Sequence, residues 1–226
     1  MEQISGTKLM EENLQLEHAT VIDVGCGDGW LSRFLAGKGA HVTGVEVSPK
    51  HLARARAVQP VADEHYMQGL AEELPVRSRS ADIVIYYNSL HHVDAMGLPW
   101  ALKEASRVLK PGGVLYISEP MAEGAYFELM KPAHDETDAR RQANEVLRRG
   151  PEFGLLVEKQ ISHVDSVEFA DFQAFHDRIT SINPHTRERF DDQEEDFRKN
   201  FERLGVQDDD RWSFEQPMRV TILRRS

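Results

Sequence analysis

The stretch Val21-Ile22-Asp23-Val24-Gly25-Cys26-Gly27-Asp28-Gly29 decides the fold. An apolar run with one acid in it gives way to three glycines at alternating positions, and residues 30–36 then repeat apolar side chains at helical spacing. This pattern predicts a buried strand, a tight turn and a helix start. Glycine tolerates a positive φ and lets a ligand approach bare backbone, while free N–H groups at a helix start favour polar or anionic ligand atoms. The sequence therefore predicts a ligand site at this turn.

Strand-like and helix-like segments alternate on both sides of the turn. Ser48-Pro49 supplies an N-cap followed by proline at the first helical position, and Lys110-Pro111-Gly112-Gly113 is a turn signal before a further strand. Strands at this spacing indicate a doubly wound parallel sheet. We expect strands at residues 20–24, 41–47, 66–67, 82–87, 114–117, within 155–169, and at 218–223. Two stripes of apolar residues, Phe172, Phe175 and Ile179, then Phe197, Phe201 and Leu204, predict buried helix faces.

The composition of the chain limits the cellular compartment and the binding partners that we expect for it. The chain of 226 residues has a formal net charge of −11, which argues against nucleic acid because phosphate backbones are bound by clustered Lys and Arg. A single cysteine permits no internal disulfide and fits a reducing cytoplasm. The start of the chain lacks signal-peptide features, and no apolar run approaches the roughly 18 residues of a membrane helix. Arg140, Arg141, Arg148 and Arg149 are expected on a solvated helix face.

Glu46 ends the second predicted strand, about twenty residues after the turn, where a carboxylate accepts both hydroxyls of a ribose. A dinucleotide site would need a third glycine at the position of Trp30, and Asp28 places negative charge where a pyrophosphate would lie. A nucleoside with a cationic, amine-bearing tail fits better. Asp23 is expected to help hold that amine, directly or through water.

Four stretches, in order, resemble motifs of the class I S-adenosylmethionine-dependent methyltransferases that act on small molecules. They are Asp23–Gly29, Gly44–Ser48, Ala71–Pro75 with Ala81–Val84, and Leu90–Val93 with Arg107–Gly113. The resemblance covers roughly residues 18–120. It implies an α/β fold: a single Rossmann-like, doubly wound domain with a mostly parallel seven-stranded sheet, an antiparallel last strand and a helical insertion after strand five.

The resemblance also implies the site. Gly25 and Gly27 would line the methionine part of S-adenosyl-L-methionine, Glu46 would hold the ribose, and Val47 would touch the adenine. Leu70 stands where many relatives have an aspartate that accepts from the adenine amino group. The predicted cofactor site comprises Asp23, Gly25, Cys26, Gly27, Glu46, Val47, Leu70, Ala71, Asn88 and Ser89.

The expected reaction is direct in-line displacement of the methyl group onto a small-molecule acceptor, leaving S-adenosyl-L-homocysteine. A base is needed only where the acceptor arrives protonated, and the candidates are His91, His92, His134 and Glu119. No metal is predicted, because no histidine or acidic cluster has convincing spacing. Partners are expected to include no nucleic acid and no membrane, and the chain to be a monomer or homodimer. The alternatives are a protein acceptor, a non-catalytic S-adenosylmethionine- or S-adenosylhomocysteine-binding partner subunit, and a nucleotide-dependent oxidoreductase. Trp30 and Asp28 argue against the oxidoreductase.

The whole chain, 1–226, is predicted to be one domain. Its parts are a cofactor-binding core at 18–120, a helical insertion at 121–150, and strands and helices at 151–226 that complete the sheet. The insertion leaves the fifth strand where the methyl group would be presented. It carries Tyr126, Phe127, Met130 and His134, side chains suited to an apolar pocket wall. We therefore expect the insertion to act as the acceptor lid.

Overall fold

The predicted alternation of strands and helices is present in the computed structural model, which describes residues 2–182 and 184–226, with the side chains of residues 2 and 3 left aside. The strands are β1 (Glu2–Gln3), β2 (Thr20–Val24), β3 (His41–Glu46), β4 (Glu64–Gln68), β5 (Ala81–Tyr87), β6 (Leu109–Pro120), β7 (Leu155–Phe169), β8 (Val206–Asp208) and β9 (Arg211–Arg225). The α-helices are α1 (Gly6–Asn13), α2 (Trp30–Gly37), α3 (Pro49–Ala57), α4 (Leu98–Val108), α5 (Ala125–Met130), α6 (Thr137–Val146), α7 (Phe172–Thr180), α8 (Pro184–Asp191) and α9 (Glu194–Leu204). Two short 3-10 helices, η1 (Leu90–His92) and η2 (Leu147–Phe153), complete the described elements.

The sheet has the order β1-β7-β9-β6-β5-β2-β3-β4 among the described residues, and β8 pairs with β9. The pairs β2–β3, β2–β5, β3–β4 and β5–β6 are parallel, whereas β8–β9 is antiparallel. The expected α/β fold with a mostly parallel sheet is confirmed, and the short strands β1 and β8 extend it to nine strands. The strand order reverses between β5 and β2, and ligands of such sheets bind beyond the carboxyl ends of the strands at that point.

The described residues divide into two compact units. Unit 2 comprises Gly6–Glu119, Arg141–Ile161 and Arg219–Ser226, and it contains all the motifs that suggested the family. Unit 1 comprises Pro120–Arg140 and Ser162–Met218, together with the residues up to Ser5. The predicted insertion at 121–150 contributes to both units, so its role as a lid stays a prediction.

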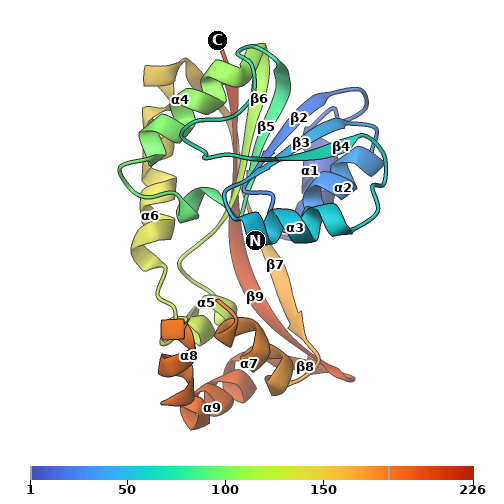
Figure 1. Ribbon diagram of the computed structural model, residues 1–226. Coiled ribbons are helices and arrows are strands. Elements are labelled where there is room, and N and C mark those ends of the chain that lie inside the picture. The colour runs from blue at the N-terminus through green and yellow to red at the C-terminus, as the bar shows by residue number, and fades with distance from the viewer. Residues whose placement is uncertain (1, 183) are drawn as a thin grey trace. The chain divides into compact units, whose positions relative to one another are not determined.

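Unit 2 is built around an aliphatic sheet core. In Figure 1, helices α1, α2 and α3 lie on one face of its sheet and α4 lies on the other. Strand β5 is buried along most of its length, as expected for a strand covered on both faces, and α4 packs Leu102 and Ala105 into the same core. Ser48 caps α3 by accepting a hydrogen bond from the backbone N–H of His51, so the predicted Ser-Pro helix start is confirmed.

Unit 1 is built around phenylalanine rings. The two predicted stripes lie on α7 and α9, and they meet Phe190 of α8 and Phe214 of β9. The rings of Phe190 and Phe197 stack with their centroids 4.2 Å apart. Both stripes are therefore core, although Leu204 is only partly buried.

The Lys110–Gly113 turn differs from expectation. It does not precede a strand but lies within β6, which already begins at Leu109. The register with β5 passes from Ala81↔Leu109 to Ile83↔Val114, so the extra residues form a bulge, and Gly112 takes a φ of 77° there.

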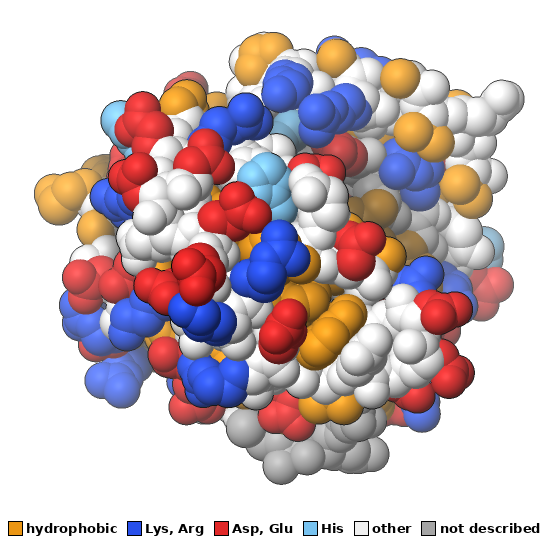
Figure 2. Space-filling model, turned by 90° about the horizontal axis from the view of Figure 1, so that it is seen from below, with side chains coloured by type: hydrophobic (Ala, Val, Ile, Leu, Met, Phe, Trp, Pro, Cys, Tyr) orange, Lys and Arg blue, Asp and Glu red, His pale blue; other side chains and the backbone are white. Residues whose placement is uncertain are grey.

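Charges are mixed on the surface. On the face drawn in Figure 2, acidic and basic side chains lie interspersed rather than segregated by sign. Among the described residues, no helix combines the length and apolar character needed to span a bilayer.

Candidate functional site

The glycine turn after β2 is tied to the neighbouring strand β3. The backbone N–H groups of Gly25 and Cys26 both donate to the carbonyl oxygen of Val45, at 2.7 and 3.1 Å. Gly25 has a φ of 73°, and a Cβ at this position would lie 2.6 Å from the Cβ of Ser89. Gly27 has a φ of 54°, and a Cβ there would meet no atom within 4 Å. Gly25 therefore permits a close approach of the β5 end, while Gly27 leaves open space above the turn.

Glu46 is held rigidly at the end of β3, with only 8% of its surface exposed. Its Oε2 accepts from the backbone N–H of Gly27 at 3.0 Å, and its Oε1 accepts from that of Ser48 at 2.8 Å. A carboxylate has about four acceptor positions, so each oxygen retains one for a further hydrogen bond. The carboxylate thus fixes the turn and remains able to bind a pair of hydroxyls.

A cavity of about 660 Å³ lies beyond the carboxyl ends of β2, β3 and β5 in unit 2. This volume falls within the range of small-molecule sites, roughly 300–1,000 Å³. Every predicted cofactor-site residue except Asp23 lines it: Gly25, Cys26, Gly27, Glu46, Val47, Leu70, Ala71, Asn88 and Ser89. The structure therefore brings together residues from four separate segments of the sequence.

Asp23 lies below the turn and is almost fully buried. It accepts a hydrogen bond from Ser32 Oγ at 2.6 Å, which ties β2 to the first turn of α2. Burial raises the pKa of Asp23 to about 6, and the nearby charge of Glu46 adds to the rise, while the hydrogen bond from Ser32 opposes it. Asp23 is absent from the described cavity lining, so its contact with the ligand's amine stays a prediction.

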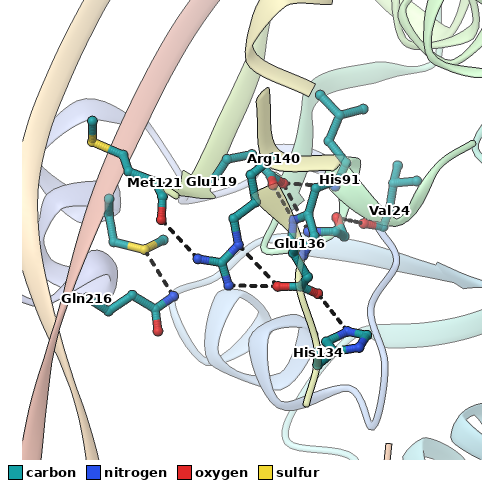
Figure 3. Close-up of polar contacts among 11 residues, drawn as sticks. Val24, His91, Glu119, Met121, His134, Glu136, Arg140 and Gln216 are labelled. Carbon is teal, nitrogen blue, oxygen red and sulfur yellow. Dashed lines mark hydrogen bonds and ion pairs between the residues drawn. The ribbon is translucent and has the colours of Figure 1, made fainter. Parts of the chain in front are cut away.

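Glu119 forms a network at the ends of β5 and β6 that the sequence did not reveal (Figure 3). Its Oε1 accepts from the backbone N–H groups of Ser89 and Leu90, at 3.0 and 2.8 Å, and its Oε2 pairs with His91 Nδ1. The Ser89 hydroxyl donates to the carbonyl oxygen of Val24 at 2.7 Å. Both Glu119 and His91 are buried, with side chains 2% and 4% exposed. These two candidate bases therefore hold the strand ends together.

The other two histidines lie in different units. His92 is exposed and lines the cavity in unit 2, and its ring lies 4.1 Å from that of His91. In unit 1, His134 Nε2 lies 3.1 Å from Glu136 Oε1. Of the three predicted catalytic histidines, His92 is the one in the described cavity lining.

Arg140 corrects the expectation of a solvated arginine face. Its guanidinium is buried and donates twice to Glu136 Oε2, at 3.1 and 2.7 Å, and to the carbonyl oxygen of Met121 at 2.9 Å (Figure 3). It also lies over the ring of Phe127, 5.0 Å from the centroid. The helical spacing of charges did not show that one arginine points inward. Arg141 and Arg149 are exposed as expected.

The cavity is acidic and has an aromatic edge. Asp28, Glu46, Glu72 and Asp94 line it, and none of the described lining residues is Lys or Arg. Trp30 and Tyr87 meet edge to face with ring centroids 5.6 Å apart, and both line the same cavity. Carboxylates and aromatic rings attract cations, so the cavity suits a positively charged ligand.

Comparisons with known proteins agree with this geometry. Residues 22–117 match the profile of a family described as a methyltransferase domain. The chain is 40% identical over 104 residues to an uncharacterised methyltransferase of Synechocystis, covering 46% of this chain and 48% of that protein. It is 34% identical over 131 residues to a malonyl-[acyl-carrier protein] O-methyltransferase of Enterobacter lignolyticus, covering 58% and 50% of the two chains. A solved methyltransferase-like structure from Bacillus halodurans superposes with a TM-score of 0.66 at 23% identity over 97% of both chains.

Over residues 22–117, the resemblance to the class I S-adenosylmethionine-dependent methyltransferases is therefore confirmed. S-adenosyl-L-methionine is the cofactor of this class, and the cavity fits it: bare backbone at Gly27, a fixed carboxylate at Glu46 and an acidic lining for a cationic ligand. The chain spans about half the length of the curated relatives that it matches. Their activities are properties of those proteins.

Proposed function

We propose that this chain is an enzyme that transfers a methyl group from S-adenosyl-L-methionine to a small-molecule acceptor. The observation that carries the proposal is the cavity at the reversal point of the sheet, which joins the glycine turn and Glu46. The match to methyltransferase proteins, including one named malonyl-[acyl-carrier protein] O-methyltransferase, supports the assignment of methyl transfer.

The chain's own residues would bind and orient. The turn at Gly25–Gly27 would accommodate the amino-acid part of the cofactor, Glu46 would accept the ribose hydroxyls, and Val47, Leu70 and Ala71 would border the adenine. The bound cofactor supplies an electrophilic methyl group on a sulfonium, so the protein needs only to align the acceptor and exclude water. This displacement requires no covalent intermediate with the enzyme.

Proton transfer would fall to His92 when the acceptor arrives protonated. An imidazole titrates near neutral pH, and His92 is exposed at the cavity. Glu119 is engaged by three N–H donors, so we assign it a structural role rather than that of the base.

Calorimetry tests the cofactor assignment. Glu46→Ala should weaken binding of S-adenosyl-L-methionine at least tenfold, about 1.4 kcal/mol, because the sugar loses its carboxylate. Glu64→Ala is the matched control: Glu64 is also a buried carboxylate that accepts two backbone N–H groups, from Val61 and Ala62, but it lies outside the described cavity lining. Equal affinities in the wild type and Glu46→Ala would remove Glu46 from the site.

Turnover separates an enzyme from a binding subunit. Incubation with methyl-labelled cofactor and a pool of low-mass metabolites should give labelled product and S-adenosyl-L-homocysteine. Tight cofactor binding without product would favour the non-catalytic partner subunit instead. Tight binding of NAD with none of S-adenosyl-L-methionine would contradict both.

A further inference from the structure

The start of α4 carries a group of exposed apolar side chains. Met96 is 86% exposed, more than any other large apolar side chain among the described residues, and Trp100 is 56% exposed. The helical hydrogen-bond pattern already begins at Asp94, whose carbonyl oxygen accepts from the N–H of Leu98 at 3.1 Å. Met96 and Trp100, four positions apart, therefore lie on one side of the helix start. Residues 95–100 include no charged side chain, and contiguous exposed apolar residues mark an interaction surface.

Basic side chains continue this surface along α4. The Nζ atom of Lys103 lies 4.7 Å from the centroid of the Trp100 ring. Arg107 follows one helical turn after Lys103, and its carbonyl oxygen accepts from the backbone N–H of Arg79 at 2.9 Å. The loop that supplies Arg79 also exposes Arg77. The apolar end of the surface thus passes into a basic end within unit 2.

The one acid of α4 does not cancel this charge. Glu104 accepts from Nε and Nη2 of Arg107 at 2.7 and 2.8 Å, and from the backbone N–H of Leu74 at 2.9 Å. Its side chain is only 16% exposed. The solvent side of α4 is therefore aromatic and basic. We define the α4 face as the apolar pair and the four cations: Met96, Trp100, Lys103, Arg107, Arg77 and Arg79.

This combination of side chains favours a lipid surface as the occupant of the α4 face. Where a helix lies on a bilayer, Trp and other apolar side chains enter the boundary of headgroups and acyl chains, and Lys and Arg bind anionic headgroups. Protein interfaces also use Trp, Met and Arg, but they are depleted in Lys. The net charge of −11 on the chain does not oppose this docking, because charges beyond a Debye length of about 8–10 Å are largely screened at physiological salt.

We propose that the α4 face docks on a bilayer that contains anionic lipid, with its apolar end in the interface and its basic end over the headgroups. Val93 and Asp94, which directly precede residues 95–100, line the cavity, so docking brings the cavity rim next to lipid. Such attachment needs no membrane-spanning helix, and the expectation of no membrane partner rested on the absence of an apolar run of that length. Lipid binding requires neither cofactor nor acceptor, so this inference stands apart from the proposed function.

Vesicle flotation tests the apolar end. The full chain should bind vesicles of phosphatidylcholine mixed with an equal amount of phosphatidylglycerol about tenfold more tightly than vesicles of phosphatidylcholine alone, and added salt should weaken the binding. The double variant Met96→Ser/Trp100→Ser should lose about tenfold in affinity for the mixed vesicles. The matched control is Leu156→Ser/Val157→Ser, an apolar pair of unit 2 that is 54% and 49% exposed on β7, and it should bind like the wild type.

Two single variants test the basic end and the depth of the ring. Lys103→Glu should lower the affinity for the mixed vesicles about fivefold or more. Lys50→Glu gives the same net charge at an exposed lysine of α3 and should change the affinity little. The tryptophan emission of the wild type should shift to shorter wavelength on the vesicles. Trp100→Phe should keep most of the affinity and abolish the shift, because Trp30 and Trp212 lie outside the α4 face.

Other results would overturn the inference. All variants should melt like the wild type, so equal vesicle binding by the wild type and Met96→Ser/Trp100→Ser would show that the α4 face does not contact lipid. No binding of the wild type to either vesicle would contradict the inference outright. Should that chain instead self-associate with rising concentration, and the double variant not, the α4 face would belong to a second copy. Failure to bind S-adenosyl-L-homocysteine would contradict the proposed function and leave the lipid result standing.

Discussion

The two units build their hydrophobic cores from different kinds of side chain. Unit 2 buries leucine, isoleucine and valine on both faces of a parallel sheet, and its polar residues gather at the carboxyl ends of the strands. Unit 1 buries a cluster of phenylalanines contributed by α7, α8, α9 and β9. The polar residues at the strand ends of unit 2 are of types that suit a ligand, whereas the residues that characterise unit 1 are of a type that suits ring packing. The family motifs therefore describe one unit only.

Removal of a buried ring should give the largest effect. Phe201→Ala should lower the free energy of unfolding by about 3–5 kcal/mol, because the ring leaves a cavity among Phe172, Phe175 and Phe214. Urea denaturation measures the loss, and hydrogen exchange followed by mass spectrometry locates it. Leu102→Ala in unit 2, also fully buried, is the matched variant, with an expected loss of about 2–5 kcal/mol.

Hydrogen exchange is the decisive measurement for these two variants. Phe201→Ala should release amides of unit 1 first, and Leu102→Ala should release amides of unit 2 first. If both variants released the same amides to the same degree, the two cores would form one cooperative block and the contrast between them would fail.

Asp23 should make unit 2 less stable as pH rises. Its pKa is raised to about 6 in the folded chain from an ordinary value of 3.8, so the folded state holds this proton more tightly. Its contribution is present in full below pH 3.8 and is lost as pH rises through 6, about 3 kcal/mol in all. Asp23→Asn keeps an acceptor for Ser32 without the charge, and that part of the pH dependence should vanish in urea titrations. An unchanged slope would show that Asp23 titrates normally.

His163 in unit 1 should give a pH dependence of stability opposite to that of Asp23. Both of its ring nitrogens are buried without a hydrogen-bond partner among the described residues, and burial lowers its pKa below 6.5. Its contribution is therefore present above pH 6.5 and lost as pH falls through the lowered pKa. His163→Leu should flatten the acid side of the stability curve, whereas Asp23→Asn should flatten the range from about pH 4 to 6.

A methyl group on the glycine turn should weaken ligand binding in addition to destabilising the fold. Gly27→Ala should weaken binding of S-adenosyl-L-methionine at least tenfold, about 1.4 kcal/mol, because the new Cβ occupies cavity space. Gly112→Ala is the control, since Gly112 also has a positive φ and open space around an added Cβ but is absent from the described cavity lining. Each change should destabilise the fold by about 1–2 kcal/mol. Equal affinities in the two variants would separate the turn from the ligand.

Loss of a helix cap should give the smallest effect. Asp171 Oδ1 accepts from the backbone N–H of Ala174 at 2.8 Å and caps α7 in unit 1. Asp171→Ala should cost about 1 kcal/mol in thermal or urea unfolding. The cofactor affinity should not change, and a change in it would mean that unit 1 influences the ligand site.

The sequence was sufficient to predict the structural features that depend on local signals. The strand–turn–helix at residues 21–36 and the Ser48-Pro49 helix start are encoded by neighbouring residues, and the nine cavity residues follow from motifs at strand ends. The network of Glu119 was not predictable, because its partners Ser89, Leu90 and His91 are 28 to 30 positions away and meet it only when β5 and β6 align. Helix α8 was missed because it has little apolar periodicity, with Thr186 and Phe190 as its buried residues.

Cys26 shows a consequence of the acidic cavity beyond ligand binding. This single thiol of the chain lines the space where a methylating sulfonium would bind. Burial raises its pKa strongly, and the charges of Asp23 and Glu46 raise it further. The thiolate is the nucleophilic form of cysteine, so a thiol kept protonated reacts slowly with an alkylating agent. Burial, together with the negative charge that attracts the cation, should therefore slow methylation of the chain's own thiol.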